Sequence, residues 1–305
     1  MQQVTVRVPA STSNLGPGYD CLGVALRLCN SVTLFRGKMP RTSHPPIVSV
    51  AAERIFKQAR HRAFSFSWSI VEQIPQCRGL GSSATVRLGV LFGLNRLCGD
   101  PLDRLSLFRL CAELEGHPDN AAPASFGGFT VVQSSAATSS LLHGRRPACP
   151  IAQRFDVGSR LCFVLLIPDL EIETARARRI LPSKIWRVAA VENCANACAL
   201  TAAFASRDYE KMRGTFSDNL HQPFRAKLIQ FLPRVITAAE RAGALGAFLS
   251  GSGSTIAAIT LEGPKKIAAA MVRAATVPAR AIITHADNRG AQVLPTCPRP
   301  SVIHR

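Results

Sequence analysis

Two short segments of this 305-residue sequence carry groups that suit phosphate chemistry. The first, residues 79–84 with the sequence GLGSSA, stands where a predicted strand passes into a predicted helix. Glycine lets an anion approach the backbone, and the amide groups and dipole of the following helix attract it. The run lacks the Gly-Lys-Ser/Thr ending of a Walker A loop, so it predicts a phosphate loop of another class.

The second segment, Ala112 to Asn120, ends a predicted helix with two carboxylates and continues into a turn with the sequence His-Pro-Asp-Asn. Phosphoryl transfer needs a metal that neutralises phosphate oxygens and an acceptor hydroxyl held in line, and such a cluster can hold both. The helix dipole disfavours carboxylates at a C-terminal end, which indicates a cation or another partner there. Either Glu113 or Glu115 could bind Mg²⁺.

The elements that must position these segments follow from the hydrophobic pattern. Val4, Val6 and Val8 alternate with polar residues, which predicts a strand that Pro9 ends, and a polar loop over 11–20 follows. An apolar run over 161–167 predicts a strand buried on both faces. The order of elements favours an α+β fold. Further strands are expected near 64–74, 247–249, 255–259 and 280–284, and helices near 51–62, 84–98, 101–112 and 265–274.

Composition limits the class of protein. With 47% hydrophobic and 18% charged residues the chain can bury a large core, and its length allows two domains, which we place at 1–150 and 151–305. The formal charge is +18, but the basic residues are spread along the chain without a nucleic-acid module, so we expect anionic metabolites as partners and no nucleic acid.

No run approaches about 18 consecutive apolar residues, so we expect no membrane span and a cytoplasmic protein. The ten cysteines are scattered over a large chain and often lie in apolar runs, so we interpret them as reduced core residues. Cys194 and Cys198 stand four apart on a predicted helix, but no second pair at zinc-ligand spacing lies near them.

Four segments together resemble the motifs of the GHMP kinases, and most closely those of its homoserine kinase family. They are 9–20 (PASTSNLGPGYD), 79–84 (GLGSSA), 115–120 (EGHPDN) and 249–253 (LSGSG). The resemblance covers nearly the whole chain, and four motifs in the same order are far more specific than any one. It implies a two-domain α+β fold: an N-terminal ribosomal-protein-S5-like α/β domain and a C-terminal ferredoxin-like α+β domain.

The resemblance also implies roles for individual residues. The phosphate loop matches Arg78, Gly79, Leu80, Gly81, Ser82, Ser83 and Ala84, with Glu115 and Ser83 as the Mg²⁺ ligands. The residues that match the family's substrate contacts are Asn14, Asp20, His117, Asn120, Thr174, Arg178, Arg225 and Gly251. Catalytic roles fall on Asn120, Asp119 and Arg178, although the resemblance leaves open whether a general base exists. Two arginines on one α-carboxylate suit the bidentate geometry of guanidinium.

The activity that this resemblance implies is transfer of phosphate from ATP to L-homoserine, a step of threonine biosynthesis, in a monomer or homodimer. A GHMP kinase for another small alcohol and a binding-only homologue are the alternatives. The stretch 51–69 has no clear match to the family's adenine-contacting segment, so the sequence identifies no adenine contact.

Overall fold

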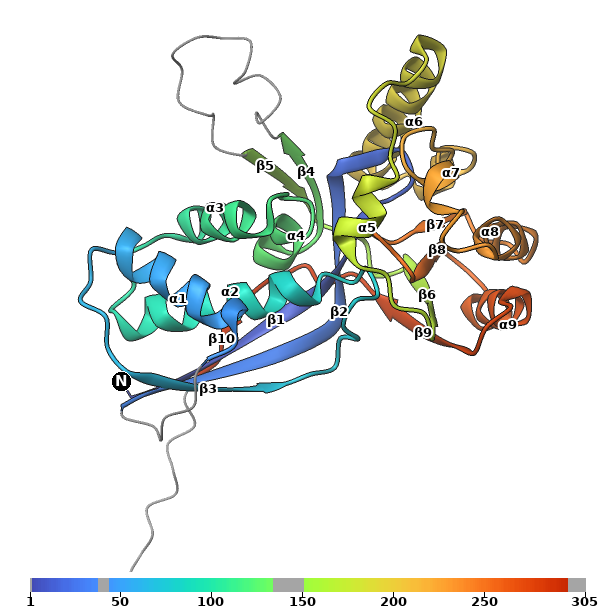
Figure 1. Ribbon diagram of the computed structural model, residues 1–305. Helices are drawn as coiled ribbons and strands as arrows, with labels where there is room; N and C mark the ends of the chain where they lie inside the picture. Colours follow the sequence, from blue (N-terminus) through green and yellow to red (C-terminus); the bar gives the residue numbers. More distant parts are fainter. Residues whose placement is uncertain (1, 38–43, 134–150, 296–305) are drawn as a thin grey trace, which may run out of the picture.

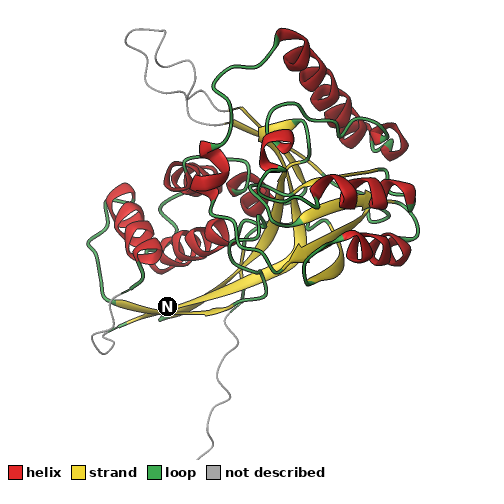
Figure 2. Ribbon diagram, turned by 45° about the vertical axis from the view of Figure 1, so that its right-hand side comes forward, coloured by secondary structure: helices red, strands yellow, loops and turns green. Residues whose placement is uncertain are grey.

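A computed structural model describes residues 2–37, 44–133 and 151–295. The described chain forms two antiparallel sheets that lie side by side, and most of its helices cover the outer faces of these sheets (Figures 1 and 2). The α+β class predicted from the sequence is therefore confirmed.

The first sheet has six strands in the order β10-β1-β2-β4-β5, with β3 paired to the free part of β2. Helices α1 to α4 pack on one face of it, and α2 contacts both central strands (Figure 1). The bounds of these elements are β1 Gln3–Asn14, β2 Gly18–Arg36, α1 Pro46–Gln58, β3 Phe66–Val71, α2 Ser82–Leu97, α3 Arg104–Glu115, α4 Ala121–Phe126, β4 Phe129–Gln133, β5 Ile151–Phe155 and β10 Gln292–Val293.

Strand β1 corrects one sequence expectation. Pro9 does not end the strand, which continues to Asn14 and includes the first residues of the expected loop. The register of β1 against β2 shifts between Pro9 and Ala10. Proline is tolerated inside a sheet at such an irregularity, because the ladder there no longer needs its missing N–H. The longer strand carries the first motif directly into the middle of the molecule.

The second sheet has the order β7-β8-β6-β9. The predicted apolar strand is β6, whose residues from Phe163 to Pro168 are all buried. Helices α8 and α9 cover this sheet with residues such as Val235 and Met271. The remaining bounds are β6 Cys162–Pro168, α5 Thr174–Arg179, α6 Arg187–Ser206, the 3₁₀ helix η1 Tyr209–Met212, α7 Gln222–Arg225, α8 Leu232–Arg241, β7 Gly246–Leu249, β8 Ile256–Thr260, α9 Pro264–Ala274 and β9 Ala279–His285.

The domain boundary at residue 150 stays a prediction, and residues 134–150 directly before it lie outside the described residues. The first sheet nevertheless takes β5 and β10 from beyond that point. Between the two sheets the chain passes through residues 156–161.

One compositional expectation needs correction. Eight cysteines lie in the described ranges and are free, but Cys77, Cys194 and Cys198 are exposed and are not core residues. Helix α6 is long and apolar enough, by length and composition alone, to cross a membrane, and it projects from the body of the protein (Figures 1 and 2). The sequence predicted a helix here, but Glu192, Asn193 and Asn196 interrupt its apolar run, so it contains no long uninterrupted apolar stretch.

Candidate functional site

The phosphate loop leads directly into helix α2. Gly81 precedes the first residue of the helix with a left-handed backbone, φ +69°, and Gly79 has φ +71°. A Cβ atom on Gly81 would stand 2.2 Å from the Ser11 hydroxyl oxygen, and one on Gly79 would stand 2.1 Å from the Ser250 carbonyl oxygen. Both positions thus require glycine for backbone geometry and for packing. The first amide groups of α2 lack acceptors within the helix and face the site as anion donors.

Hydrogen bonds tie the phosphate loop to the first and third motifs. The Ser250 hydroxyl donates to the Gly79 carbonyl at 2.7 Å and lies 2.8 Å from the Thr12 hydroxyl. Arg78 donates to the carbonyl of Pro168 and forms ion pairs with two exposed carboxylates of the second half. Segments far apart in the sequence are therefore held together before any ligand binds.

Glu115 lies beside the start of α2. One of its carboxylate oxygens accepts a hydrogen bond from the Ser83 hydroxyl at 2.8 Å, and the other pairs with the guanidinium of Arg87. Glu113 points elsewhere, to an exposed ion pair with Arg54. The geometry therefore favours Glu115 over Glu113 as a ligand next to the phosphate loop. A carboxylate and a hydroxyl are hard oxygen donors that suit Mg²⁺.

The His-Pro-Asp-Asn turn forms a buried hydrogen-bonded chain. A ring nitrogen of His117 lies 2.8 Å from a carboxylate oxygen of Asp119, which also accepts the backbone N–H of Asn120. The Asn120 amide donates to the Ser13 hydroxyl and accepts from the Ser11 hydroxyl at 2.8 Å. Burial alone would raise the pKa of Asp119, but the hydrogen bond and charge of His117 outweigh it, so that the pKa is lowered.

Asp20 and Arg178 form the charged part of the site. Two nitrogens of the Arg178 guanidinium donate to the two carboxylate oxygens of Asp20 at 2.9 and 2.7 Å. Arg178 also donates to the hydroxyl of Tyr19, and its third nitrogen, Nε, is buried without a partner among the described residues. Burial, and then the charge of Asp20, raise the pKa of the Tyr19 phenol.

The Asn14 side chain sets the backbone around Asp20. Its oxygen accepts the Asp20 N–H and its nitrogen donates to the Gly251 carbonyl, both at 3.0 Å. Asn14 and Asp20 both adopt left-handed backbone conformations, which are rare for residues other than glycine. Strain of this kind persists only where the surroundings impose it, and it concentrates at functional sites.

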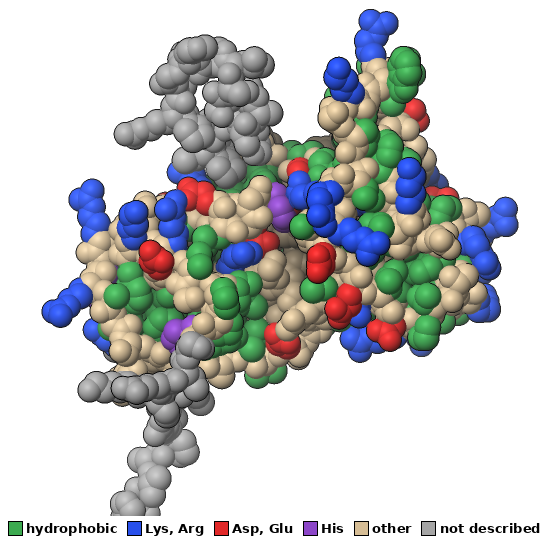
Figure 3. Space-filling view, in the orientation of Figure 1, with side chains coloured by type: hydrophobic (Ala, Val, Ile, Leu, Met, Phe, Trp, Pro, Cys, Tyr) green, Lys and Arg blue, Asp and Glu red, His purple; other side chains and the backbone are tan. Residues whose placement is uncertain are grey.

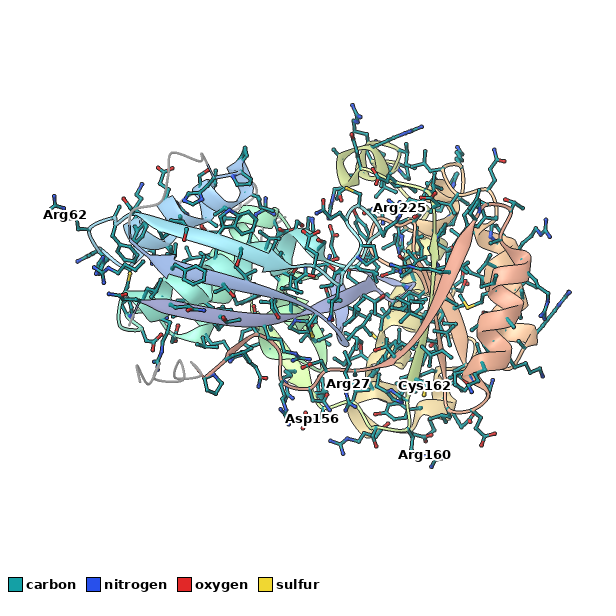
Figure 4. All side chains as sticks on the ribbon, turned by 90° about the horizontal axis from the view of Figure 1, so that it is seen from below. Arg27, Arg62, Asp156, Arg160, Cys162 and Arg225 are labelled. Carbon is teal, nitrogen blue, oxygen red and sulfur yellow. The ribbon has the colours of Figure 1, made fainter. Side chains whose placement is uncertain are left out.

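Arg225 is 2% exposed and lies at the junction of the two halves, where Figure 4 labels it. It donates to the carbonyl oxygens of Ala177 and Gly251. One of its nitrogens also lies 3.3 Å from a ring nitrogen of His221, whose pKa burial lowers to about 4. His221 is therefore neutral at pH 7 and adds no second charge next to Arg225.

All these segments line one cleft of about 590 Å³ between the two halves. Basic side chains gather around the junction on the face shown in Figure 3. Of the residues expected at the site, only Ala84 does not line the cleft, because its side chain is buried in the core. The expected residues that line it are Asn14, Asp20, Arg78, Gly79, Leu80, Gly81, Ser82, Ser83, Glu115, His117, Asp119, Asn120, Thr174, Arg178, Arg225 and Gly251.

The structure adds residues that the sequence analysis missed. Trp68 and Ile47 also line the cleft and offer it an apolar surface, and Arg87 reaches Glu115. Tyr19 lies beneath two cations, with the guanidinium carbons of Arg178 and Arg225 5.6 and 5.4 Å from its ring centre. The signal for Tyr19 in the sequence is that an aromatic residue stands directly before Asp20 of the first motif. The described residues hold no group of three or more His, Cys, Asp or Glu side chains arranged for a metal ion.

The fold is that of a GHMP kinase. Residues 46–128 match the GHMP kinases N terminal domain, and residues 200–276 match the GHMP kinases C terminal domain. A crystal structure of phosphomevalonate kinase from Streptococcus pneumoniae shares this fold, with a TM-score of 0.70 at 13% identity over 94% of this chain and 100% of that one.

More similar proteins identify the family. The homoserine kinase of Caldicellulosiruptor bescii is 36% identical over 273 residues, which cover 85% of each chain. That of Carboxydothermus hydrogenoformans is 35% identical over 94% of this chain and 96% of its own. The crystal structure of homoserine kinase from Cytophaga hutchinsonii superposes with a TM-score of 0.84 at 25% identity, covering 96% and 98%. The chain belongs to the homoserine kinase family.

Proposed function

We propose that the chain transfers the γ-phosphoryl group of ATP to the side-chain hydroxyl of L-homoserine, giving O-phospho-L-homoserine for threonine biosynthesis. The observation that supports this substrate is the bidentate pair of Asp20 with Arg178 in the same cleft as the phosphate loop. L-Homoserine carries an ammonium and a carboxylate on one carbon atom. A carboxylate beside a guanidinium is complementary to both groups at once.

Substrate binding then replaces the ion pair between Asp20 and Arg178 with two ion pairs to the substrate. The substrate ammonium pairs with the Asp20 carboxylate, and the substrate carboxylate pairs with Arg178, whose buried Nε supplies a further donor. No charge is left unpaired by the exchange, which limits its desolvation cost. Arg225 is already fixed by two carbonyl oxygens and adds positive potential to the lining of the cleft.

The acceptor hydroxyl is positioned by the buried chain of His117, Asp119 and Asn120. A general base works best with a pKa near the operating pH, and Asp119 has a lowered pKa. Asp119 therefore serves to orient His117 and Asn120, and the amide of Asn120 holds the hydroxyl. Catalysis in this account rests on positioning and on neutralising phosphate charge.

Glu115 and the Ser83 hydroxyl are the residues that would hold Mg²⁺, which when bound neutralises charge on the phosphate oxygens. They fit because their oxygen atoms already lie 2.8 Å apart at the start of α2. Arg87 occupies one oxygen of Glu115, so it must turn away for that oxygen to become a ligand. Amide groups of the phosphate loop bind the β- and γ-phosphates, and the apolar surface of Trp68 and Ile47 is suited to the adenine.

The test is release of ADP by the purified protein with a panel of alcohols. L-Homoserine is compared with 3-aminopropan-1-ol, which lacks the carboxylate, with 4-hydroxybutyrate, which lacks the ammonium, and with mevalonate. We expect kcat/KM for L-homoserine to exceed that for both truncated alcohols by at least about tenfold, because each loses a charge-assisted contact. Preference for mevalonate, or equal rates with all alcohols, would assign the protein to another GHMP activity.

A further inference from the structure

Arg87 lines the cleft directly beside the two residues that would hold Mg²⁺. It stands in the second turn of α2, four residues after Ser83, so the two side chains lie on the same face of the helix. Side chains of a helix tilt towards its N-terminus, and one turn rises by only about 5.4 Å. The guanidinium of Arg87 can therefore reach an anion bound at the first amide groups of α2.

In the free protein, Arg87 compensates the charge of Glu115. The Glu115 side chain is only 5% exposed, and the Arg87 side chain is 22% exposed. Within the described parts of the chain, Glu115 is the one acceptor that Arg87 bonds to. A carboxylate buried to this degree needs a counter-charge, so the pair stabilises the protein before any ligand binds.

The other arginines of the cleft, as far as the structure describes it, already have fixed roles. Arg78 and Arg225 donate to backbone carbonyl oxygens, and Arg178 pairs with the carboxylate of Asp20. Arg87 differs from all three, because the residue it pairs with is the one that would bind the metal. A cation that binds Glu115 frees this guanidinium next to the phosphate loop.

We propose that Arg87 exchanges partners when the nucleotide binds: it leaves Glu115 and donates to an oxygen of the β- or γ-phosphate of ATP. This inference rests on the proposed kinase activity, since it needs ATP at the phosphate loop. Guanidinium suits phosphate oxygens, and a carboxylate oxygen suits Mg²⁺. If Arg87 stayed on Glu115, two positive charges would share one carboxylate and repel each other. After the exchange no buried charge lacks a partner.

The exchange gives Arg87 opposite effects on two ligands. In the absence of ATP it competes with a metal ion for Glu115, so it weakens metal binding. Towards ATP it is a ligand, so it strengthens nucleotide binding. A side chain that only supported the fold would not produce this pair of opposite effects.

Mn²⁺ alone, as a spectroscopic substitute for Mg²⁺, tests the competition. The EPR signal of the free ion is measured as Mn²⁺ is added to the protein without nucleotide. Arg87→Met removes the charge and keeps an unbranched apolar side chain, and it should lower the Kd for Mn²⁺ about tenfold. Arg96→Met is the matched control, because Arg96 lies on the same helix in an exposed ion pair with Asp100 and does not line the cleft. It should leave the Kd unchanged.

ATP without metal tests the contact with phosphate. Calorimetric titration with ATP in EDTA is made in the Glu115→Gln background, where no carboxylate competes for Arg87. Adding Arg87→Met there should raise the Kd for ATP about tenfold, because one charge-assisted bond is lost. Arg87→Lys keeps the positive charge and should raise the Kd by a smaller factor, and Arg96→Met should not change it.

An unchanged Kd for ATP on adding Arg87→Met to Glu115→Gln would overturn the proposal and leave Arg87 as a counter-charge for Glu115 alone. So would a Kd for Mn²⁺ that does not fall in Arg87→Met. Neither measurement uses an acceptor alcohol, so these results would leave the proposed kinase activity standing. A parent protein that binds no ATP would instead contradict both proposals.

Discussion

Removing the guanidinium of Arg178 is the change whose effect the structure defines best. Arg178 makes two charge-assisted hydrogen bonds with Asp20, and we propose that it gives equivalent bonds to the substrate carboxylate. Its side chain is 34% exposed, so solvent weakens each bond to the low end of the usual range, about 1.5 kcal/mol. Without substrate, Arg178→Ala also lacks the pair with Asp20, and this offsets part of the loss on binding. The net loss of binding free energy for the substrate therefore equals about one to two such bonds.

A loss of about 1.5 to 3 kcal/mol corresponds to a fall of about 10- to 100-fold in kcat/KM for L-homoserine in Arg178→Ala. The same variant should change kcat/KM for 3-aminopropan-1-ol by less than about threefold, because that alcohol has no carboxylate to lose. The ratio of the two values therefore narrows, and KM for ATP stays nearly constant. Arg179→Ala is the control: Arg179 lies on the same helix but does not line the cleft.

Steady-state kinetics with both alcohols measures this ratio, and because both reactions use the same protein, a partly unfolded variant does not distort it. An unchanged ratio in Arg178→Ala would refute the assignment of Arg178 to the carboxylate, as would an equal change in Arg179→Ala.

Three further changes test other parts of the site. Glu115→Gln should lower Mg²⁺-dependent turnover about a hundredfold and raise the Mg²⁺ concentration needed for half-maximal rate. Glu113→Gln breaks only an exposed ion pair and should do neither. The opposite ranking of the two variants would identify Glu113 as the ligand. Gly81→Ala should lower the free energy of unfolding by more than about 2 kcal/mol and weaken ATP binding, because the new Cβ displaces Ser11 from Asn120. Gly99 has φ +89° but open space around it, so Gly99→Ala should lower the free energy of unfolding in urea by only about 1 kcal/mol. Equal losses in the two variants would count against this packing argument. Because the pKa of His221 is lowered from 6.5 to about 4, its contribution to stability is complete above about pH 6.5 and is lost as the pH falls towards 4; we expect about 2 kcal/mol of lost stability at pH 5 relative to pH 7.5, and a smaller loss in His221→Gln. A loss of the same size in His221→Gln would remove His221 as the cause.

The phosphate loop and the His-Pro-Asp-Asn turn could be predicted from the sequence because their chemistry is local. Gly81 stands at a strand-to-helix junction, and Glu115, Asp119 and Asn120 lie within six residues of one another. Such segments carry their own geometry, since the backbone positions the functional groups directly.

The pairing of Asp20 with Arg178 could not be read from the sequence, because 158 residues separate them and only the packing of α5 onto the first motif joins them. The same holds for Arg87 and Glu115, which come from neighbouring helices. The resemblance assigned Arg178 to a substrate carboxylate, but it could not show that the arginine already holds Asp20 in the free protein.

Helix α6 shows a different limit of sequence reasoning. Apolar residues surround much of its circumference, a pattern typical of a helix buried in a core, yet most of its surface is exposed. The hydrophobic pattern of a helix predicts that its apolar face is buried against another surface. It does not tell whether that surface belongs to the same chain.

The central claim is that this protein makes O-phospho-L-homoserine, and identification of the product tests it most directly. The purified protein is incubated with ATP, Mg²⁺ and L-homoserine, and the reaction is followed by ³¹P NMR and mass spectrometry. We expect a new phosphomonoester with the mass of O-phospho-L-homoserine that forms in equal amount to ADP. Release of ADP with inorganic phosphate alone, or no turnover of L-homoserine while another alcohol is phosphorylated, would contradict the account.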